Sequence, residues 1–152
     1  MPPTQPPRLV FLLNAAQRRL QQLMAFEQLR FARDGHEPPS PAQGGLLFVL
    51  KQGDGRTMGE IAQALDLAPS ATTGLVQRSE ALGWVKRAPC EQDARTQRVW
   101  LQPDGLAQLP ALRSAVQHIN RRLTAGFTAD ELATVARWLA HVQASAQETE
   151  LP

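Results

Sequence analysis

The sequence predicts a mainly helical α+β fold in which one small β-hairpin interrupts a series of helices. Apolar residues recur at three- and four-residue spacing through most of the 152 residues, as they do in helices with one buried face. Two capping motifs mark helix starts in the first half of the chain. Residues 84–87 and 98–101 instead alternate in the manner of strands, and a polar segment separates them.

The first two helices are predicted from helix-breaking and capping residues as much as from apolar periodicity. Residues 1–7 contain four prolines, and we expect them to form a disordered tail. A long amphipathic helix is expected over residues 8–33, which hold no glycine or proline and precede an Asp-Gly pair at 34–35. Ser40 begins a capping motif, with proline next and glutamine three residues later, so a second helix should run to about residue 52.

The centre of the chain predicts two helices joined by a tight turn. Thr57 and Glu60 form a second capping box, which opens a short helix. Residues 66–68 make the turn, and Pro69 suits the first position of the next helix. That helix should run to about Leu82 and end at the glycine that follows.

After the hairpin, two more helices close the chain, over about 104–125 and 129–146. Both segments repeat apolar residues with helical spacing, and Thr128 caps the second with Glu131 three residues later. The predicted order is therefore helix, helix, short helix, turn, helix, hairpin, helix, helix.

Composition excludes several classes of protein. With 43% hydrophobic and 20% charged residues the chain is not expected to be disordered, and its single cysteine, Cys90, fits a reducing compartment. We find no signal-peptide pattern and no apolar run of about 18 residues, so we expect a cytoplasmic protein without a membrane partner. The formal net charge of +2 permits a polyanionic partner without requiring one.

Nothing in the sequence predicts an enzyme, a metal site or a cofactor. The three histidines, His36, His118 and His141, are far apart in the sequence and lack the helical pairing that metal sites favour. The chain holds no nucleophile elbow and no glycine-rich phosphate loop.

Residues 57–82 fit a helix-turn-helix, whose second helix enters the major groove of DNA by its N-terminal half. The groove admits small, hydrogen-bonding side chains, and residues 69–74 are of this kind. A helix that buries Leu75, Ser79 and Leu82 would direct a set of polar or small residues outward. That set is Ser70, Thr73, Gly74 and Gln77, with Arg78 at its edge in a position suited to a phosphate. The alternative is an ordinary surface helix with a Ser/Thr-rich start.

The hairpin tip carries Asp93 two residues before Arg95, with Arg98 beyond. Such an aspartate can hold one arginine by a charge-assisted bond, while another arginine reaches into the narrow minor groove. The alternative is a solvated turn whose charges are incidental.

In combination, residues 40–110 resemble the MarR family of winged helix-turn-helix regulators. Residues 57–65 look like the first helix of that motif, and residues 68–78 look like its recognition helix. Residues 80–87 look like the exit into the wing, and Asp93 and Arg95, followed by residues 99–101, look like the wing signature.

The resemblance implies a homodimer that binds a near-palindromic double-stranded DNA site, most often as a repressor. Helices at 8–35 and 104–148 would form the dimer, and residues 40–103 would form the DNA-binding lobe. It implies base contacts by Ser70, Thr73 and Gln77, phosphate contacts by Arg78 and Lys86, and a minor-groove contact by Arg95 or Arg98. Many members also bind a small aromatic or phenolic effector between the dimer helices and the lobe.

Four residues depart from the family pattern. Ala68 replaces a capping residue, Gly74 replaces a long basic residue, Ser79 replaces an apolar one and Gln102 replaces a capping threonine. Gly74 and the modest charge favour a second hypothesis, a winged-helix module for protein association that does not bind DNA. A steep salt dependence of duplex binding would separate the two hypotheses.

Overall fold

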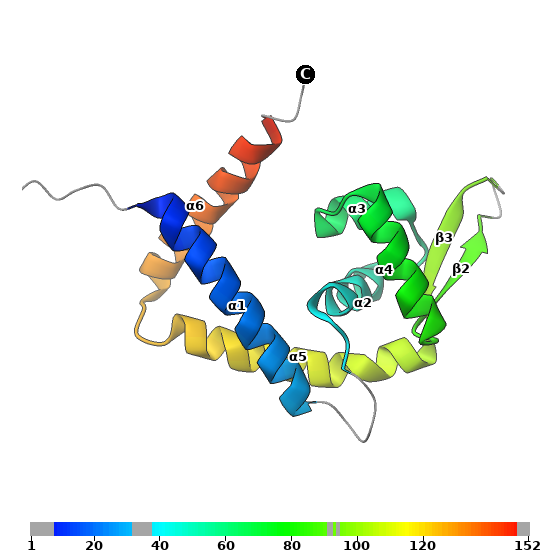
Figure 1. The fold of residues 1–152 in the computed structure, drawn as a ribbon, viewed down its shortest axis with the longest axis horizontal. Helices are drawn as coiled ribbons and strands as arrows, with labels where there is room; N and C mark the ends of the chain where they lie inside the picture. Colours follow the sequence, from blue (N-terminus) through cyan, green and yellow to red (C-terminus); the bar gives the residue numbers. More distant parts are fainter. Residues whose placement is uncertain (1–7, 32–37, 91–92, 94, 149–152) are drawn as a thin grey trace, which may run out of the picture. The chain divides into compact units, whose positions relative to one another are not determined.

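The computed structural model describes residues 8–31, 38–90, 93 and 95–148, and it confirms a mainly helical fold with one small sheet (Figure 1). The predicted tail at 1–7 and the predicted helix end at 34–35 lie outside the described residues. In chain order the elements are α1 (Leu9–Phe31), α2 (Pro41–Gln52), β1 (Arg56–Thr57), α3 (Met58–Leu65), α4 (Pro69–Ala81), β2 (Val85–Pro89), β3 (Gln97–Leu101), α5 (Pro103–Thr124) and α6 (Ala129–Glu148).

The chain forms two compact units, residues 1–117 and 118–152, with the boundary inside α5. The second unit contains the end of α5 and the whole of α6. The start of α6 confirms the predicted cap, since the Glu131 N–H donates to the Thr128 hydroxyl at 3.3 Å and the Thr128 N–H donates to the Glu131 carboxylate at 2.8 Å. These two bonds satisfy donors that a helix start would otherwise leave unpaired.

Both central capping boxes form as predicted. At α2 the Gln43 N–H donates to the Ser40 hydroxyl, and the Ser40 N–H donates to the Gln43 side-chain oxygen at 2.8 Å. At α3 the same exchange joins Thr57 and Glu60, and it holds the pKa of the Glu60 carboxyl below its ordinary value. By contrast Ala68, the residue that precedes α4, provides no side-chain cap, so the proline at the first helical position sets the start.

The predicted hairpin forms, since β2 and β3 pair antiparallel, but the sheet has a third strand that the sequence did not predict, in the order β1-β3-β2. The missing strand, β1, pairs antiparallel with β3 and brings Arg56 opposite Val99 and Thr57 opposite Arg98. A strand of two residues has no detectable period in the sequence, which is why only the tertiary pairing defines it.

One hydrophobic core joins α2, α3, α4, the sheet and the first part of α5 in the first unit. Apolar side chains from all of these elements are almost inaccessible to solvent. They are Leu46, Leu47, Leu50, Ile61, Leu75, Val76, Trp84, Val85, Val99, Leu109 and Leu112. Because neighbouring elements share this core, the turn between α3 and α4 and the base of the hairpin have fixed positions.

The core sets the rotation of α4 about its own axis. Leu75 and Ser79 are buried as predicted, but Leu82 is 50% exposed, which corrects the prediction that it belongs to the buried face. Leu82 follows the last helical residue, Ala81, and lies beyond the edge of the core. The buried stripe is completed instead by Thr72 and Val76, which are 1% and 0% exposed.

An ion pair joins the hairpin to α4. The Arg87 guanidinium lies 2.7 Å from the Glu80 carboxylate, and its Nε donates to the same carboxylate at 2.8 Å. The Arg87 backbone N–H also donates to Glu80 at 2.9 Å. The backbone bond, with the guanidinium bond next, lowers the pKa of the Glu80 carboxyl below its ordinary value of 4.5. The pair therefore couples the wing to the end of α4.

We expect Glu80→Gln to lower the free energy of unfolding by about 1 kcal/mol at pH 7, because the replacement keeps the shape but loses the charge-assisted bonds. The pKa of Glu80 is lowered in the folded protein, so its contribution is present above pH 4.5 and is lost as the pH falls through the folded value. Urea unfolding of both proteins at pH 7 and pH 3 measures the difference, which should shrink in acid. In a double-mutant cycle with Arg87→Gln, strictly additive effects would contradict the coupling.

Candidate nucleic-acid interface

The exposed face of α4 is polar and free of large apolar side chains. Ser70, Thr73 and Gln77 are all exposed on it, and Gly74 lies half-exposed among them. The Thr73 hydroxyl donates to the Pro69 carbonyl at 3.0 Å, which leaves its oxygen available as an acceptor. The rigid core behind the helix and the short side chains in front make this face suitable for close approach to another molecule.

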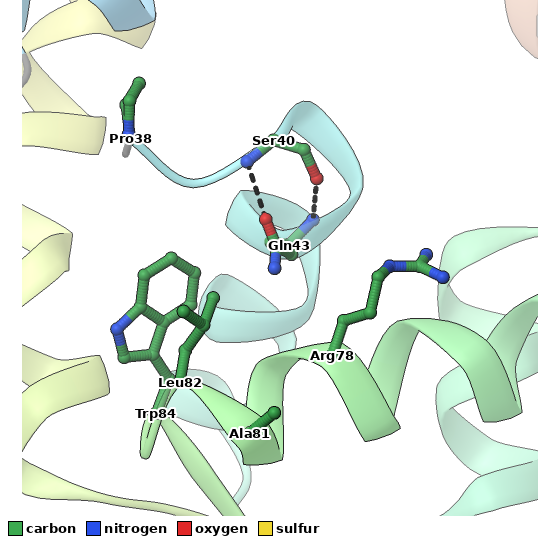
Figure 2. A pocket seen from close by; sticks show the side chains of 7 residues that line it. All are labelled: Pro38, Ser40, Gln43, Arg78, Ala81, Leu82 and Trp84. Atoms are coloured by element: carbon green, nitrogen blue, oxygen red, sulfur yellow. Dashed lines mark hydrogen bonds between the residues drawn. The ribbon is translucent and has the colours of Figure 1, made fainter. Parts of the chain in front are cut away.

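Arg78 extends along this face toward the start of α4. Its Nη1 lies only 3.1 Å from the position that a Cβ would take at Gly74, one helical turn earlier. Figure 2 shows the guanidinium directed away from Trp84 and Leu82, which lie near the end of the helix. The structure therefore places the Arg78 side chain close to Gly74, a contact that the sequence analysis did not predict.

Asp93 organises the hairpin tip through the backbone. Its carboxylate accepts the Arg95 backbone N–H at 3.0 Å and the Thr96 hydroxyl at 3.1 Å. The sequence predicts a bond from this carboxylate to an arginine side chain, but the ion pairs formed among the described residues include none between Asp93 and the Arg95 guanidinium. The Arg95 side chain is exposed at the tip. A short polar turn favours such local side-chain-to-backbone bonds.

The Arg98 side chain forms hydrogen bonds to other residues of the lobe. Its Nη1 donates to the Gly55 carbonyl at 2.6 Å and its Nε donates to the Cys90 sulfur at 3.3 Å, a contact that raises the pKa of the guanidinium. These bonds connect β3 to the segment before β1 and to the end of β2. Of the two arginines expected at the minor groove, Arg95 is therefore the one placed at the tip.

Lys86 is exposed on the outer face of the sheet. The register places it opposite Trp100, whereas the neighbouring pair Arg87 and Val99 belongs to the face that meets α4 and the core. Successive strand residues point to opposite faces. Lys86, which was expected to contact phosphate, therefore lies on the sheet face opposite the one that packs against α4 and the core.

Sequence reasoning missed the segment at 53–55, which supports the base of the wing. The Asp54 carboxylate accepts the Leu101 N–H at 2.8 Å and the Gly55 N–H at 3.0 Å. Gly55 has φ +69°, and a Cβ there would lie 2.5 Å from the Trp100 ring. An Asp-Gly pair followed by a basic residue was the available signal, but it reads equally well as a simple turn.

A pocket of about 430 Å³ lies between the start of α2 and the end of α4 (Figure 2). Leu82 and Trp84 give it apolar walls, and the indole of Trp84 is 6% exposed. Ser40 and Gln43, which bond to each other, supply polar groups at the opposite side. Its full lining is Pro38, Ser40, Gln43, Arg78, Ala81, Leu82 and Trp84.

Two negative findings apply to the part of the chain that the structure describes. It contains no cluster of three or more histidine, cysteine, aspartate or glutamate side chains arranged to bind a metal ion. Nor do its helices include one that combines the length and the apolarity needed to cross a membrane.

Comparison of the sequence with known proteins gives a consistent result. A family model described as the MarR family matches residues 38–96. An uncharacterized HTH-type transcriptional regulator of Bacillus subtilis, YsmB, is 30% identical over 99 residues, which cover 65% of this chain and 67% of that protein. The multiple antibiotic resistance protein MarR of Salmonella typhimurium is 34% identical over 77 residues, or 50% of this chain and 54% of that protein. The second match therefore spans about half of the relative's length.

The fold agrees over a longer range. A mutant MarR from E. coli, solved in complex with operator DNA, is 26% identical and superposes with a TM-score of 0.77 over 88% of this chain and 92% of that one. These matches are to transcription regulators, in accord with the expectation that the chain is not an enzyme. The sequence identity, the matched motifs and the shared architecture show that this chain belongs to the MarR family of winged helix-turn-helix transcriptional regulators.

Proposed function

We propose that the chain is a sequence-specific transcription regulator that binds a near-palindromic operator as a homodimer and acts as a repressor. The observation that carries the proposal is the exposed face of α4, where Ser70, Thr73 and Gln77 present short polar side chains from a helix fixed by the core. Such a face fits the major groove. The E. coli relative of known structure was solved with operator DNA, which supports the same role here.

The proposed contacts with DNA are of two kinds, those to base edges and those to the phosphate backbone. Ser70, Thr73 and Gln77 would contact base edges, since hydroxyl and amide groups match the donor and acceptor pattern of the major groove. Arg95 at the hairpin tip would enter the minor groove beside α4, and Lys86 would contact phosphate from the side of the wing. The Glu80–Arg87 pair supports this arrangement because it couples the wing to the helix.

The test is the salt dependence of duplex binding. For the wild type we expect a steep negative slope of log affinity against log salt, and Arg95→Ala should flatten it by about one unit because one cationic contact is lost. Fluorescence anisotropy with a duplex selected from a random library measures both slopes.

Arg98→Ala is the matched control, because that guanidinium is bound to Gly55 and Cys90 and its loss should reduce stability more than it changes the slope. A wild-type slope near zero would reject DNA binding and would favour the association module instead.

The dimer is supported by apolar side chains that α1 leaves exposed. Val10 and Phe11 are each 73% exposed and Leu29 is 67% exposed. Others on the helix with large exposed fractions are Leu9, Leu12 and Phe26. An uncovered apolar surface of this extent is typical of an interface. A twofold dimer would present two copies of α4, which is the symmetry that a palindromic site requires.

Sedimentation at micromolar concentration should therefore show a dimer. Phe11→Glu should shift the equilibrium toward the monomer, because it places a charge in the proposed interface. Gln52→Glu is the control, because it adds a negative charge at an exposed residue of α2, outside both helical regions expected to form the dimer, and it should leave the equilibrium unchanged. A wild-type monomer at this concentration would contradict the proposal.

We also propose that the pocket at Trp84 binds a small aromatic effector. Its volume of about 430 Å³ lies in the range of small-molecule sites, and its walls combine an indole and an aliphatic side chain with the polar Ser40 and Gln43. One wall is the end of α4, so an occupant could bias the position of the recognition helix.

Leu82→Trp should fill this pocket with little effect on folding, because Leu82 is 50% exposed. With 4-hydroxybenzoate and phenol as probes, we expect isothermal titration to detect binding to the wild type and a loss of at least tenfold in the variant. Duplex affinity without the probe should be unchanged. Equal binding of a probe to both proteins would place the effector elsewhere, and no binding of either probe to the wild type would count against an aromatic effector of this kind.

A further inference from the structure

Three residues of α4 lie in one row along its exposed face. Ser70, Gly74 and Arg78 follow one another at four-residue intervals, so each lies nearly above the last on the helix surface. Helical side chains lean toward the N-terminus, which directs Arg78 over Gly74 and toward Ser70. Gly74, the middle residue, has no side chain. The row therefore contains an open space between the helix start and Arg78.

The Arg78 guanidinium occupies that space. Its Nη1 comes within 3.1 Å of the position of a Cβ at Gly74, so a methyl group at 74 would require the guanidinium to move by a few tenths of an ångström, and a longer side chain would compete with it for the same space. The guanidinium lies about one turn, or roughly 5–6 Å, nearer the helix start than the Cα of Arg78. The guanidinium therefore lies beside Thr73 and Gly74, among the residues proposed to contact bases.

The neighbouring charges leave Arg78 available. The ion pairs found among the described residues do not include one to Arg78. Glu80, the acidic residue nearest to it in the sequence, is bound to Arg87 through three hydrogen bonds or ion-pair contacts. Residues two apart on a helix also point in different directions.

We infer that Arg78 is a specificity-determining residue that contacts a guanine in the major groove, and that Gly74 provides the space for it. This inference rests on the proposed function, and it differs from the phosphate contact expected from the sequence. The guanidinium presents a planar pair of N–H donors, which matches the O6 and N7 acceptors of guanine in two parallel hydrogen bonds. A lysine carries the same charge but does not reproduce that planar pair.

The test compares three proteins in a selection of random duplexes, followed by competition binding. The wild type should enrich a guanine at one position of each half-site. Arg78→Ala and Arg78→Lys should both lose that preference, with a cost of about five- to a hundred-fold for the preferred duplex. Arg78→Lys should nevertheless keep the salt slope and the non-specific affinity of the wild type, because it keeps the charge.

Gly74→Ala tests whether the space left by the glycine is needed for the Arg78 guanidinium. The added methyl should shift the guanidinium by a few tenths of an ångström and weaken the preference at the same base pair, and it should have little further effect in an Arg78→Ala background. Gln77→Ala is the comparison within the helix and should alter a different base pair. Arg113→Ala removes an exposed arginine of α5 and should alter none. Melting temperatures show that the variants are folded.

The outcomes distinguish a failure of this inference from a failure of the proposed function. If Arg78→Lys selects the same sequences as the wild type while Arg78→Ala weakens all sequences alike, Arg78 contacts phosphate and the inference is wrong. If Gly74→Ala shifts a base pair that Arg78→Ala leaves unchanged, the inference is also wrong. If the wild type shows no salt-dependent duplex binding, the proposed function fails, and this inference fails with it.

Discussion

The buried stripe of α4 is the constraint on which the rest of the lobe depends. Leu75 and Val76 provide its apolar contacts, and two hydroxyl residues, Thr72 and Ser79, are as deeply buried. Each hydroxyl donates to the carbonyl one turn earlier, at 3.1 Å to Ala68 and 3.0 Å to Leu75, so neither is left unsatisfied. Small side chains with internally paired hydroxyls let the helix lie close to the core. That packing fixes which face of α4 remains exposed.

A second group of interactions positions the wing relative to this helix. The Glu80–Arg87 pair joins β2 to the end of α4, and Arg98 and Asp54 join β3 to the loop before β1. These contacts are charge-assisted and partly screened by solvent, so each is individually modest. Together they constrain the hairpin at its base, while Asp93 shapes its tip. A wing held in this way can present Arg95 at a defined distance from α4.

The exposed face of α4 shows how packing and function meet in one element. Gly74 has a cost in helix propensity, and a glycine is an unusual choice in the middle of a helix. Gly74 lies beneath the Arg78 guanidinium, where even a Cβ would require that group to shift and a longer side chain would compete for its space. The same arginine is among the residues that line the pocket at Trp84. The end of the recognition helix thus borders both the proposed DNA contact and the proposed effector site.

Local signals in the sequence determined most of the fold. Capping boxes at Ser40 and Thr57, the proline at the start of α4 and the alternation of the two hairpin strands each act within a few residues, and the structure has every one of them. The exposure of the side chains on α4 followed for the same reason, because helical periodicity is a local property.

Tertiary structure alone decided what depends on contacts between distant residues. The pairing of β1, the engagement of Arg98 by Gly55 and the outward position of Lys86 result from contacts across the sheet. The exposure of Leu82 results from where the core ends rather than from its place in the repeat. A sequence pattern states which residues share a face, but the surrounding elements determine which member of that face is covered and which charged group is already bound.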